Sequence, residues 1–174
     1  RLSQVLAGAF RAGADGVEFR VLEGKGWGAP VSGSQGLSRL LSTVCDDSYD
    51  QSPQIRNEML GRRELTSQGA KARRELIQAM IDHADEERLG LKGFGPECAM
   101  YEAVLRHTGL HAKRAEGWAF GAPKAGGSLR HVWGSIAQFI DAASDEPVSV
   151  ARLYERLVSP PIGLKEGPIP VLLV

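Results

Sequence analysis

Residues 66–84 read TSQGAKARRELIQAMIDHA and carry the clearest helical pattern of the chain. Thr66 or Ser67 can cap the N-terminus, because a hydroxyl oxygen accepts a hydrogen bond from a backbone N–H of the first turn. Apolar side chains follow at helical spacing and predict one buried stripe, made of Leu76, Ile77, Met80, Ile81 and Ala84. The sequence therefore predicts an amphipathic helix over residues 67–84.

Similar patterns extend on both sides of this helix. Residues 37–45 have apolar side chains at i, i+3, i+4, i+7 and i+8, and another helix is expected to begin at Pro96 and to stop at Gly109. Ser149 is expected to cap a further helix. A helix over residues 129–143 is predicted to bury Val132, Trp133, Ile136, Phe139 and Ile140.

Short strands are predicted at two places. Residues 16–23 alternate between apolar and polar side chains, after a short helical pattern at residues 2–11. Residues 117–121 place Trp118 and Phe120 on one face. The expected fold class is therefore mainly α with short β strands, in winged-helix or helix-turn-helix-like modules.

The predicted domain organisation has three parts. Residues 1–33 form a lead-in with a short helix and a strand, residues 34–112 form a helical winged-helix-like module, and residues 113–174 form a second helical module. This second module is expected to be truncated, because the final stretch GPIPVLLV opens with a helix-start signal and then stops. The chain begins at Arg1 and enters directly into an apolar pattern, so we expect a piece of a longer protein.

The composition is that of an ordinary soluble globular protein, with 43% hydrophobic and 24% charged residues. The 21 basic and 21 acidic side chains cancel, so only local clusters of charge can attract nucleic acid or a membrane surface. Cys45 and Cys98 provide no disulfide framework and indicate a reducing compartment. No apolar run approaches the ~20 residues of a membrane span. The cytoplasm is therefore the expected location, without a membrane partner.

Motifs for nucleotide or metal chemistry are weak. The Gly-rich stretches 24–27 and 121–127 lack the spacing of a Walker A phosphate loop. Cys98, His107 and His111 could together hold a metal ion, but a buried thiol and two surface imidazoles are the favoured alternative. No metal and no cofactor are therefore predicted.

Cys98 is also a candidate nucleophile. It falls in the first turn of a predicted helix, where the helix N-terminus can lower the pKa of a thiol. His83, His107 or His131 could supply the base. The favoured alternative is an inert thiol, since this helix needs a core and free cysteines are commonly buried. We therefore expect no catalytic residue in this chain.

Basic side chains cluster around the helix at residues 67–84. The cluster consists of Arg56, Arg62, Arg63, Lys71, Arg73 and Arg74, and the last five are the expected phosphate contacts. Such a group can neutralise phosphates, and a helix-turn-helix would present it to a DNA groove. The alternative is a solvated helix face with internal ion pairs to neighbouring glutamates.

A second basic group flanks the predicted strand at residues 117–121. It consists of Lys113, Arg114, Lys124 and Arg130. A wing carrying these side chains could touch a DNA backbone. Trp118 and Phe120 are expected to be core residues rather than part of that contact.

Several segments of the chain resemble one protein family. They are SPQIRNEML at 52–60, RRELTS at 62–67, ARRELI at 72–77, LGLKGFGPE at 89–97 with Met100 and Tyr101, TGLH at 108–111, LYERL at 153–157 and PPIGLKEG at 160–167. They are similar to a region of the large bacterial multidomain P-loop ATPases associated with phage exclusion and related DNA-directed defence systems. The resemblance covers about two thirds of the chain. It implies a helical, winged-helix-like segment downstream of an ATPase core, in the bacterial cytoplasm. The family's ATPase motifs have no counterpart in this sequence, so no catalytic residue can be carried over.

The sequence and the resemblance together predict a non-catalytic helical module of a larger bacterial ATPase. It would contact DNA phosphates through the basic cluster around residues 67–84, and this contact would set affinity rather than sequence choice. One alternative is a protein–protein assembly module of the same larger protein, with the apolar end at 169–174 packed on its other parts. The other alternative is a Cys-dependent enzyme built on Cys98.

Overall fold

The computed structural model describes residues 33–62, 64–144 and 146–174 of the chain. The predicted helix at residues 2–11 and the predicted strand at residues 16–23 lie outside the described residues. Within the described part the protein is mainly helical, with one two-stranded antiparallel sheet. This confirms the coarse fold class that the sequence predicted.

The chain divides into two units, Arg1–Asp50 and Gln51–Val174. The first unit contributes helix α2 (Gly33–Ser48), which confirms the helix predicted from the apolar spacing at residues 37–45. The domain boundaries expected after residues 33 and 112 stay predictions.

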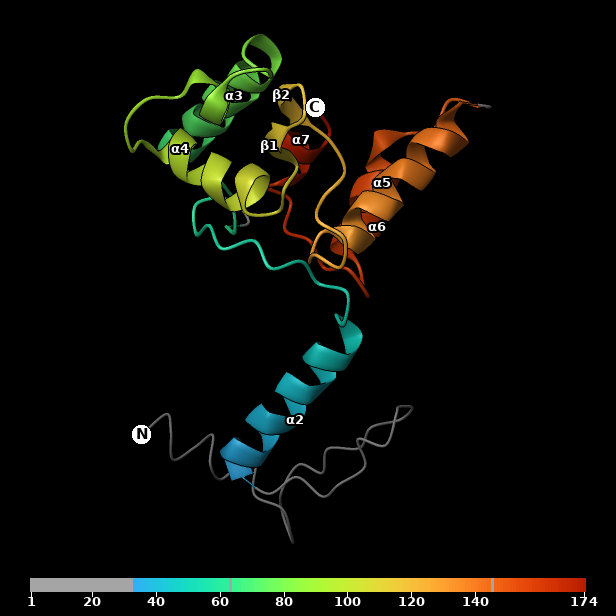
Figure 1. Ribbon diagram of the computed structural model, residues 1–174. Helices are drawn as coiled ribbons and strands as arrows, with labels where there is room; N and C mark the ends of the chain where they lie inside the picture. The colour runs from blue at the N-terminus through green and yellow to red at the C-terminus, as the bar shows by residue number, and fades with distance from the viewer. Residues whose placement is uncertain (1–32, 63, 145) are drawn as a thin grey trace, which may run out of the picture. The chain divides into compact units, whose positions relative to one another are not determined.

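Helix α3 (Ser67–Asp82) confirms the helix that the sequence marked most clearly (Figure 1). Thr66 is its N-cap, and the hydroxyl oxygen accepts a hydrogen bond of 3.1 Å from the backbone N–H of Gly69. The prediction that Ile81 is buried is wrong, because 63% of this residue is exposed. The buried stripe instead runs through Gly69, Ala72, Leu76, Ala79 and Met80. Three of these buried residues are glycine or alanine, which a search for strongly hydrophobic side chains does not identify.

Helix α4 (Pro96–Tyr101) continues directly into η2 (Glu102–Arg106), which is one turn of π-helix. The wider turn is closed by the backbone N–H of His107, which donates to the carbonyl of Glu102 at 3.0 Å. Helix α4 packs against α3, and β1 contacts η2. The inner face of α4 and η2 is fully buried in the hydrophobic core through Met100, Tyr101, Val104 and Leu105. The helix predicted from Pro96 is therefore present, with a change of helical type in its second half.

The sheet is a hairpin of β1 (His111–Arg114) and β2 (Gly117–Phe120). His111 pairs with Phe120, and Lys113 pairs with Trp118. Because directly paired residues point to the same face, His111 and Phe120 meet side by side. Strand β2 was expected from the sequence, whereas β1 was not.

Helices α5 (Arg130–Ala143) and α6 (Val150–Val158) pack against each other. Ser149 caps α6 as predicted, and its hydroxyl accepts a hydrogen bond of 3.3 Å from the backbone N–H of Ala151. The prediction that Trp133 and Ile140 are buried is wrong, since they are 38% and 59% exposed. Only the face of α5 that carries Val132, Ser135 and Ile136 is buried.

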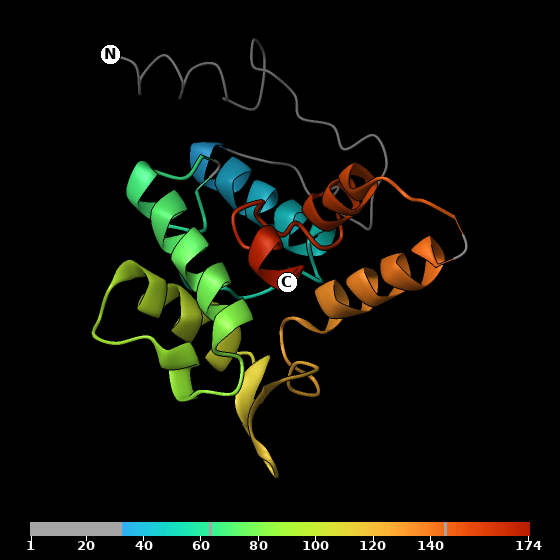
Figure 2. The ribbon, with the colours of Figure 1, turned by 90° about the horizontal axis from the view of Figure 1, so that it is seen from above.

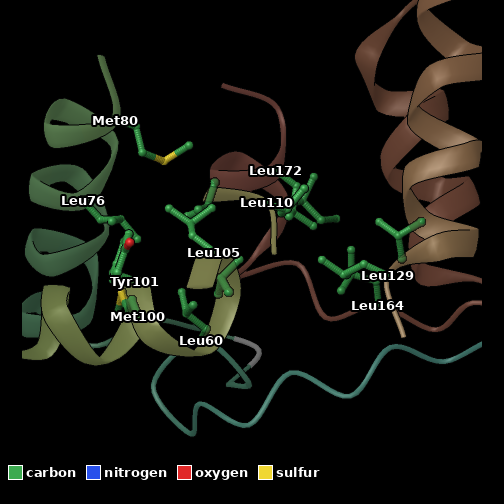
Figure 3. Close-up of a cluster of buried hydrophobic side chains, with 14 of the residues drawn as sticks. Leu60, Leu76, Met80, Met100, Tyr101, Leu105, Leu110, Leu129, Leu164 and Leu172 are labelled. Carbon is green, nitrogen blue, oxygen red and sulfur yellow. The ribbon is translucent and has the colours of Figure 1, made fainter. Parts of the chain in front are cut away.

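The last helix, α7 (Ile169–Leu172), lies between α3 and α5 in both Figure 1 and Figure 2. Ile169, Val171 and Leu172 are buried there in the main hydrophobic core. Figure 3 shows core side chains from α3, α4, α7 and the intervening loops meeting between the helices. The apolar segment at 169–172 therefore packs within its own unit, whereas Leu173 and Val174 are exposed.

Gly167, just before α7, fixes how this last segment reaches the core. A Cβ atom at this position would overlap the backbone carbonyl oxygen of Leu60. Arg73 of α3 also contacts Gly167, because its Nη1 donates a hydrogen bond of 3.2 Å to the carbonyl oxygen of that glycine. The contact requires glycine, since backbone atoms cannot move aside as the end of a flexible side chain can.

We expect Gly167→Ala to destabilise the protein by about 1–3 kcal/mol, because the added methyl group forces two backbone segments apart. Gly134→Ala is the matched control, since nothing lies within 4 Å of a Cβ at that position inside α5. The control should be neutral or should stabilise by up to about 1 kcal/mol through helix propensity. Urea denaturation followed by circular dichroism measures both variants, and equal stability of the two would contradict the close approach at Gly167.

Candidate nucleic-acid interface

The described members of the predicted basic cluster do not share one environment. Arg62 is exposed in the turn before α3, and Lys71 and Arg74 are exposed on α3 itself. Arg73 is half-buried. Arg63 lies outside the described residues. Arg73 therefore differs in burial from the other described members of the cluster.

The exposed cations differ in how far their charge is offset. Lys71 Nζ lies 3.6 Å from Glu75 Oε1, an exposed i,i+4 ion pair of the kind that contributes little to stability. Within the described residues, Arg62 and Arg74 form no ion pair and no side-chain hydrogen bond. Their guanidinium donors are therefore available to an anion in solution.

Arg73 is occupied by a contact inside the protein. Its guanidinium binds the carbonyl oxygen of Gly167, as described above. Its position agrees with helical geometry, because it lies three and four residues before Leu76 and Ile77, which face the core. The same spacing in the sequence could have indicated that Arg73 lies nearer the core than Arg74.

The second basic group is largely tied to backbone and neighbouring side chains. Arg114 Nε donates to the carbonyl oxygen of Ala119 at 3.5 Å, and Lys124 Nζ donates to the carbonyl oxygen of His107 at 2.9 Å. Arg130 Nε donates to a ring nitrogen of His131 at 2.8 Å. Lys113 is exposed on β1. Three of these four cations are therefore partly engaged by contacts inside the protein.

His111 is fully buried, so its interpretation as a surface imidazole is wrong. Its Nε2 lies 2.9 Å from the carbonyl oxygen of Ala84, and its Nδ1 lies 2.9 Å from the hydroxyl of Tyr101. Because a carbonyl can only accept, Nε2 carries the proton and Nδ1 accepts from Tyr101. Both ring nitrogens are used, and neither has a free lone pair for a metal ion.

The ring of His111 is also enclosed by aromatic side chains. Trp118 stacks on it with ring centroids 5.4 Å apart, and Phe120 lies at 4.8 Å. Tyr101 meets it edge-on at 5.7 Å. Within the described part of the chain, no three His, Cys, Asp or Glu side chains gather closely enough to hold a metal ion. The role of His111 that the geometry supports is structural.

Cys98 lies in an environment that favours the neutral thiol. It is 2% exposed, and its Sγ lies 3.7 Å from the carbonyl oxygen of Lys92 and 3.6 Å from Glu97 Oε1. Burial, and next the negative charge of Glu97, raise the pKa of the Cys98 thiol above 9.0. Since the thiolate is the nucleophile, this arrangement disfavours nucleophilic chemistry near neutral pH.

No family model, curated protein or solved structure matches this chain. None of the helices in the described residues has the length and apolar character that crossing a bilayer requires.

Stability should fall at alkaline pH through Tyr101. Burial, and next the charge of Glu102, raise the pKa of the Tyr101 hydroxyl above 10.0. From about pH 10 upward the unfolded chain releases a tyrosine proton that the folded protein keeps. The free energy of unfolding therefore decreases with pH in that range, while the contribution of Tyr101 is fully present below it.

We expect Tyr101→Phe to reduce this alkaline decrease, and to cost about 1–3 kcal/mol at neutral pH because Nδ1 of His111 loses its donor. Tyr154→Phe is the control, since the Tyr154 hydroxyl has no hydrogen-bond partner in the described residues. Urea denaturation between about pH 8 and about pH 11 measures both effects. An unchanged alkaline slope in Tyr101→Phe would refute this assignment.

Proposed function

We propose that the unit at 51–174 is a non-catalytic helical module that contacts DNA phosphates through basic side chains on and before α3. The supporting observation is that the guanidinium groups of Arg62 and Arg74 are exposed without an ion pair in the described residues. A guanidinium group presents donors in a fixed plane that matches two phosphate oxygens. Contacts of this kind position a protein on DNA without reading its sequence.

Lys71 contributes a further positive charge, weakened by its pairing with Glu75. Arg63 remains part of the proposed contact on the strength of its sequence position. Arg73 acts differently, since its contact with Gly167 holds α3 against the segment that leads into α7. We therefore propose Arg73 as a residue that positions the interface rather than one that binds phosphate.

We propose in addition that the unit is a variant of the winged-helix arrangement. The order of α3, α4 and the hairpin β1–β2 is that of the last two helices and the wing of such a domain. Lys113 and Arg114 are exposed on this hairpin and would touch the DNA backbone as wing residues. The connection between α3 and α4 is longer than the tight turn of a standard helix-turn-helix motif.

We propose that the parent protein is a bacterial cytoplasmic P-loop ATPase of a phage-exclusion or related DNA-directed defence system. The support is the resemblance carried by the segments at 52–60, 89–97 and 160–167. In such a protein, this module would present a DNA-binding surface to an ATPase core. Its positive charge is local, because the chain as a whole is neutral.

Fluorescence anisotropy with a labelled random-sequence duplex, across a series of salt concentrations, tests the DNA contact. We expect Arg62→Gln/Arg74→Gln to weaken binding about tenfold at low salt and to lower the salt slope by about two, since two phosphate contacts are lost. Arg152→Gln/Lys165→Gln removes the same charge from exposed positions elsewhere in the unit and should have little effect. Equal losses in the two double variants, or no binding by the wild type, would overturn the proposal.

A second candidate function is protein–protein assembly, and Phe94 favours it. This side chain is 100% exposed between Gly93 and Gly95, and Trp133 and Ile140 are also exposed on α5. Phe and Trp are enriched in protein–protein interfaces relative to the rest of the protein surface.

If assembly is the function, we expect the protein to associate with itself in sedimentation velocity experiments at high concentration, independently of salt. Phe94→Ala should shift it toward the monomer, whereas Lys92→Ala in the same loop should not. A protein that remains monomeric at every concentration would count against self-assembly through Phe94.

A further inference from the structure

A groove of about 660 Å³ lies on the outer side of α4 and η2. Its cationic lining comes from three separate parts of the chain, Arg56 before α3, Arg106 at the end of η2 and Lys124 in the loop after β2. We propose that this groove binds the phosphate group of a phosphorylated ligand. The groove contains none of the side chains proposed above to contact DNA on and before α3, so the inference goes beyond the proposed function.

The charge balance of the groove favours an anion. Glu102 is its only carboxylate among the described lining residues, and it is already held by arginines. Arg106 Nη1 lies 3.1 Å and 3.2 Å from the two carboxylate oxygens, and Arg88 Nε lies 3.4 Å from one of them. Glu102 thus orients Arg106 toward the groove, while Arg56 and Lys124 keep a positive excess.

Hydrogen-bond donors in the groove remain unused. Within the described residues, Arg56 and the imidazole of His107 have no side-chain partner. Lys124 Nζ gives one hydrogen bond to the carbonyl oxygen of His107, which leaves two of its three N–H donors. The same contact pairs a carbonyl oxygen at the negative end of the helix, which reduces the repulsion of an anion by that end.

Lys124 is held in place by the backbone around it. Its backbone N–H donates to the carbonyl oxygen of Thr108 at 2.9 Å. Gly109 has φ of +81°, and a Cβ there would lie 2.8 Å from Cγ of Lys124. The absence of a side chain at Gly109 therefore lets the lysine stem cross the end of the helix and places its ammonium group beside His107.

The π-helical turn is a second, independent indication of a site. It joins Glu102 to His107 by an i→i+5 hydrogen bond, so that these two residues lie one above the other at the groove. Such turns weaken a helix locally and are found frequently at functional sites. Here the turn brings His107 to the same wall as Glu102 and Arg106.

The ligand class follows from this lining. A phosphate group accepts several hydrogen bonds and carries the charge that Arg56, Arg106 and Lys124 complement. Ala99 and Ala103 add a small apolar wall to the groove, which has room for the sugar attached to a phosphate. A nucleotide and the backbone of a nucleic acid present the same group, and the experiment below distinguishes them.

The test is a titration of the protein with sodium phosphate, with adenosine monophosphate and with a short DNA strand, followed by the imidazole NMR signals of His107. Sodium chloride at matched ionic strength is the reference. We expect saturable shifts with phosphate and with adenosine monophosphate. Arg56→Gln/Lys124→Gln should weaken both at least about tenfold, as expected when two charged contacts are lost. Arg152→Gln/Lys165→Gln should leave them unchanged.

Arg56→Gln alone keeps the test valid if the double variant is unstable, because Arg56 is exposed and has no partner among the described residues. DNA that displaces adenosine monophosphate from the groove identifies a nucleic-acid phosphate as the source. Failure of DNA to displace it identifies a small phosphorylated ligand. Shifts that follow ionic strength only, or that persist unchanged in Arg56→Gln, overturn the proposal. Arg62→Gln/Arg74→Gln should not alter the phosphate titration. The groove proposal and the proposed DNA contact through α3 are therefore tested independently.

Discussion

The buried hydrogen-bond chain from Tyr101 through His111 to Ala84 is the interaction on which the rest of the second unit depends. It joins α4, β1 and the segment just after α3, which meet in the core. A fully buried imidazole is tolerated only when both nitrogens are satisfied, and here each has one partner of the right kind. The aromatic side chains of β2 then close over the ring, which is why a hairpin of two short strands can be part of a stable core.

A second constraint lies along the first half of α3, where Arg73 and Leu60 both contact Gly167. Together these contacts hold α3 from within its first half and from just beyond its C-terminal end, and they leave its outer face to solvent. This arrangement gives two neighbouring arginines different roles. Arg73 faces the segment before α7 and stabilises the fold, whereas Arg74, one residue later and about 100° around the helix, faces water.

The positive charge of this unit is concentrated in local surface regions. With equal numbers of acidic and basic side chains, no long-range field attracts a polyanion to the whole chain. Arg62 and Arg74 lack ion pairs among the described residues, and the groove beside η2 gathers cations whose one carboxylate is already paired. Both surfaces carry a local excess of positive charge, of the kind that complements a phosphate group.

The sequence by itself determined the elements whose causes are local. The hydroxyl caps at Thr66 and Ser149, the helical periodicity of α3 and the alternation in β2 each lie within a few residues, so they could be predicted. Only the tertiary structure decided which positions face the core, as Ile81 and Trp133 show, because burial depends on what packs opposite. Strand β1 and the two partners of His111 also escaped prediction. The groove depends in the same way on distant segments, since Arg56, Arg106 and Lys124 are brought together by non-local packing that no local pattern records.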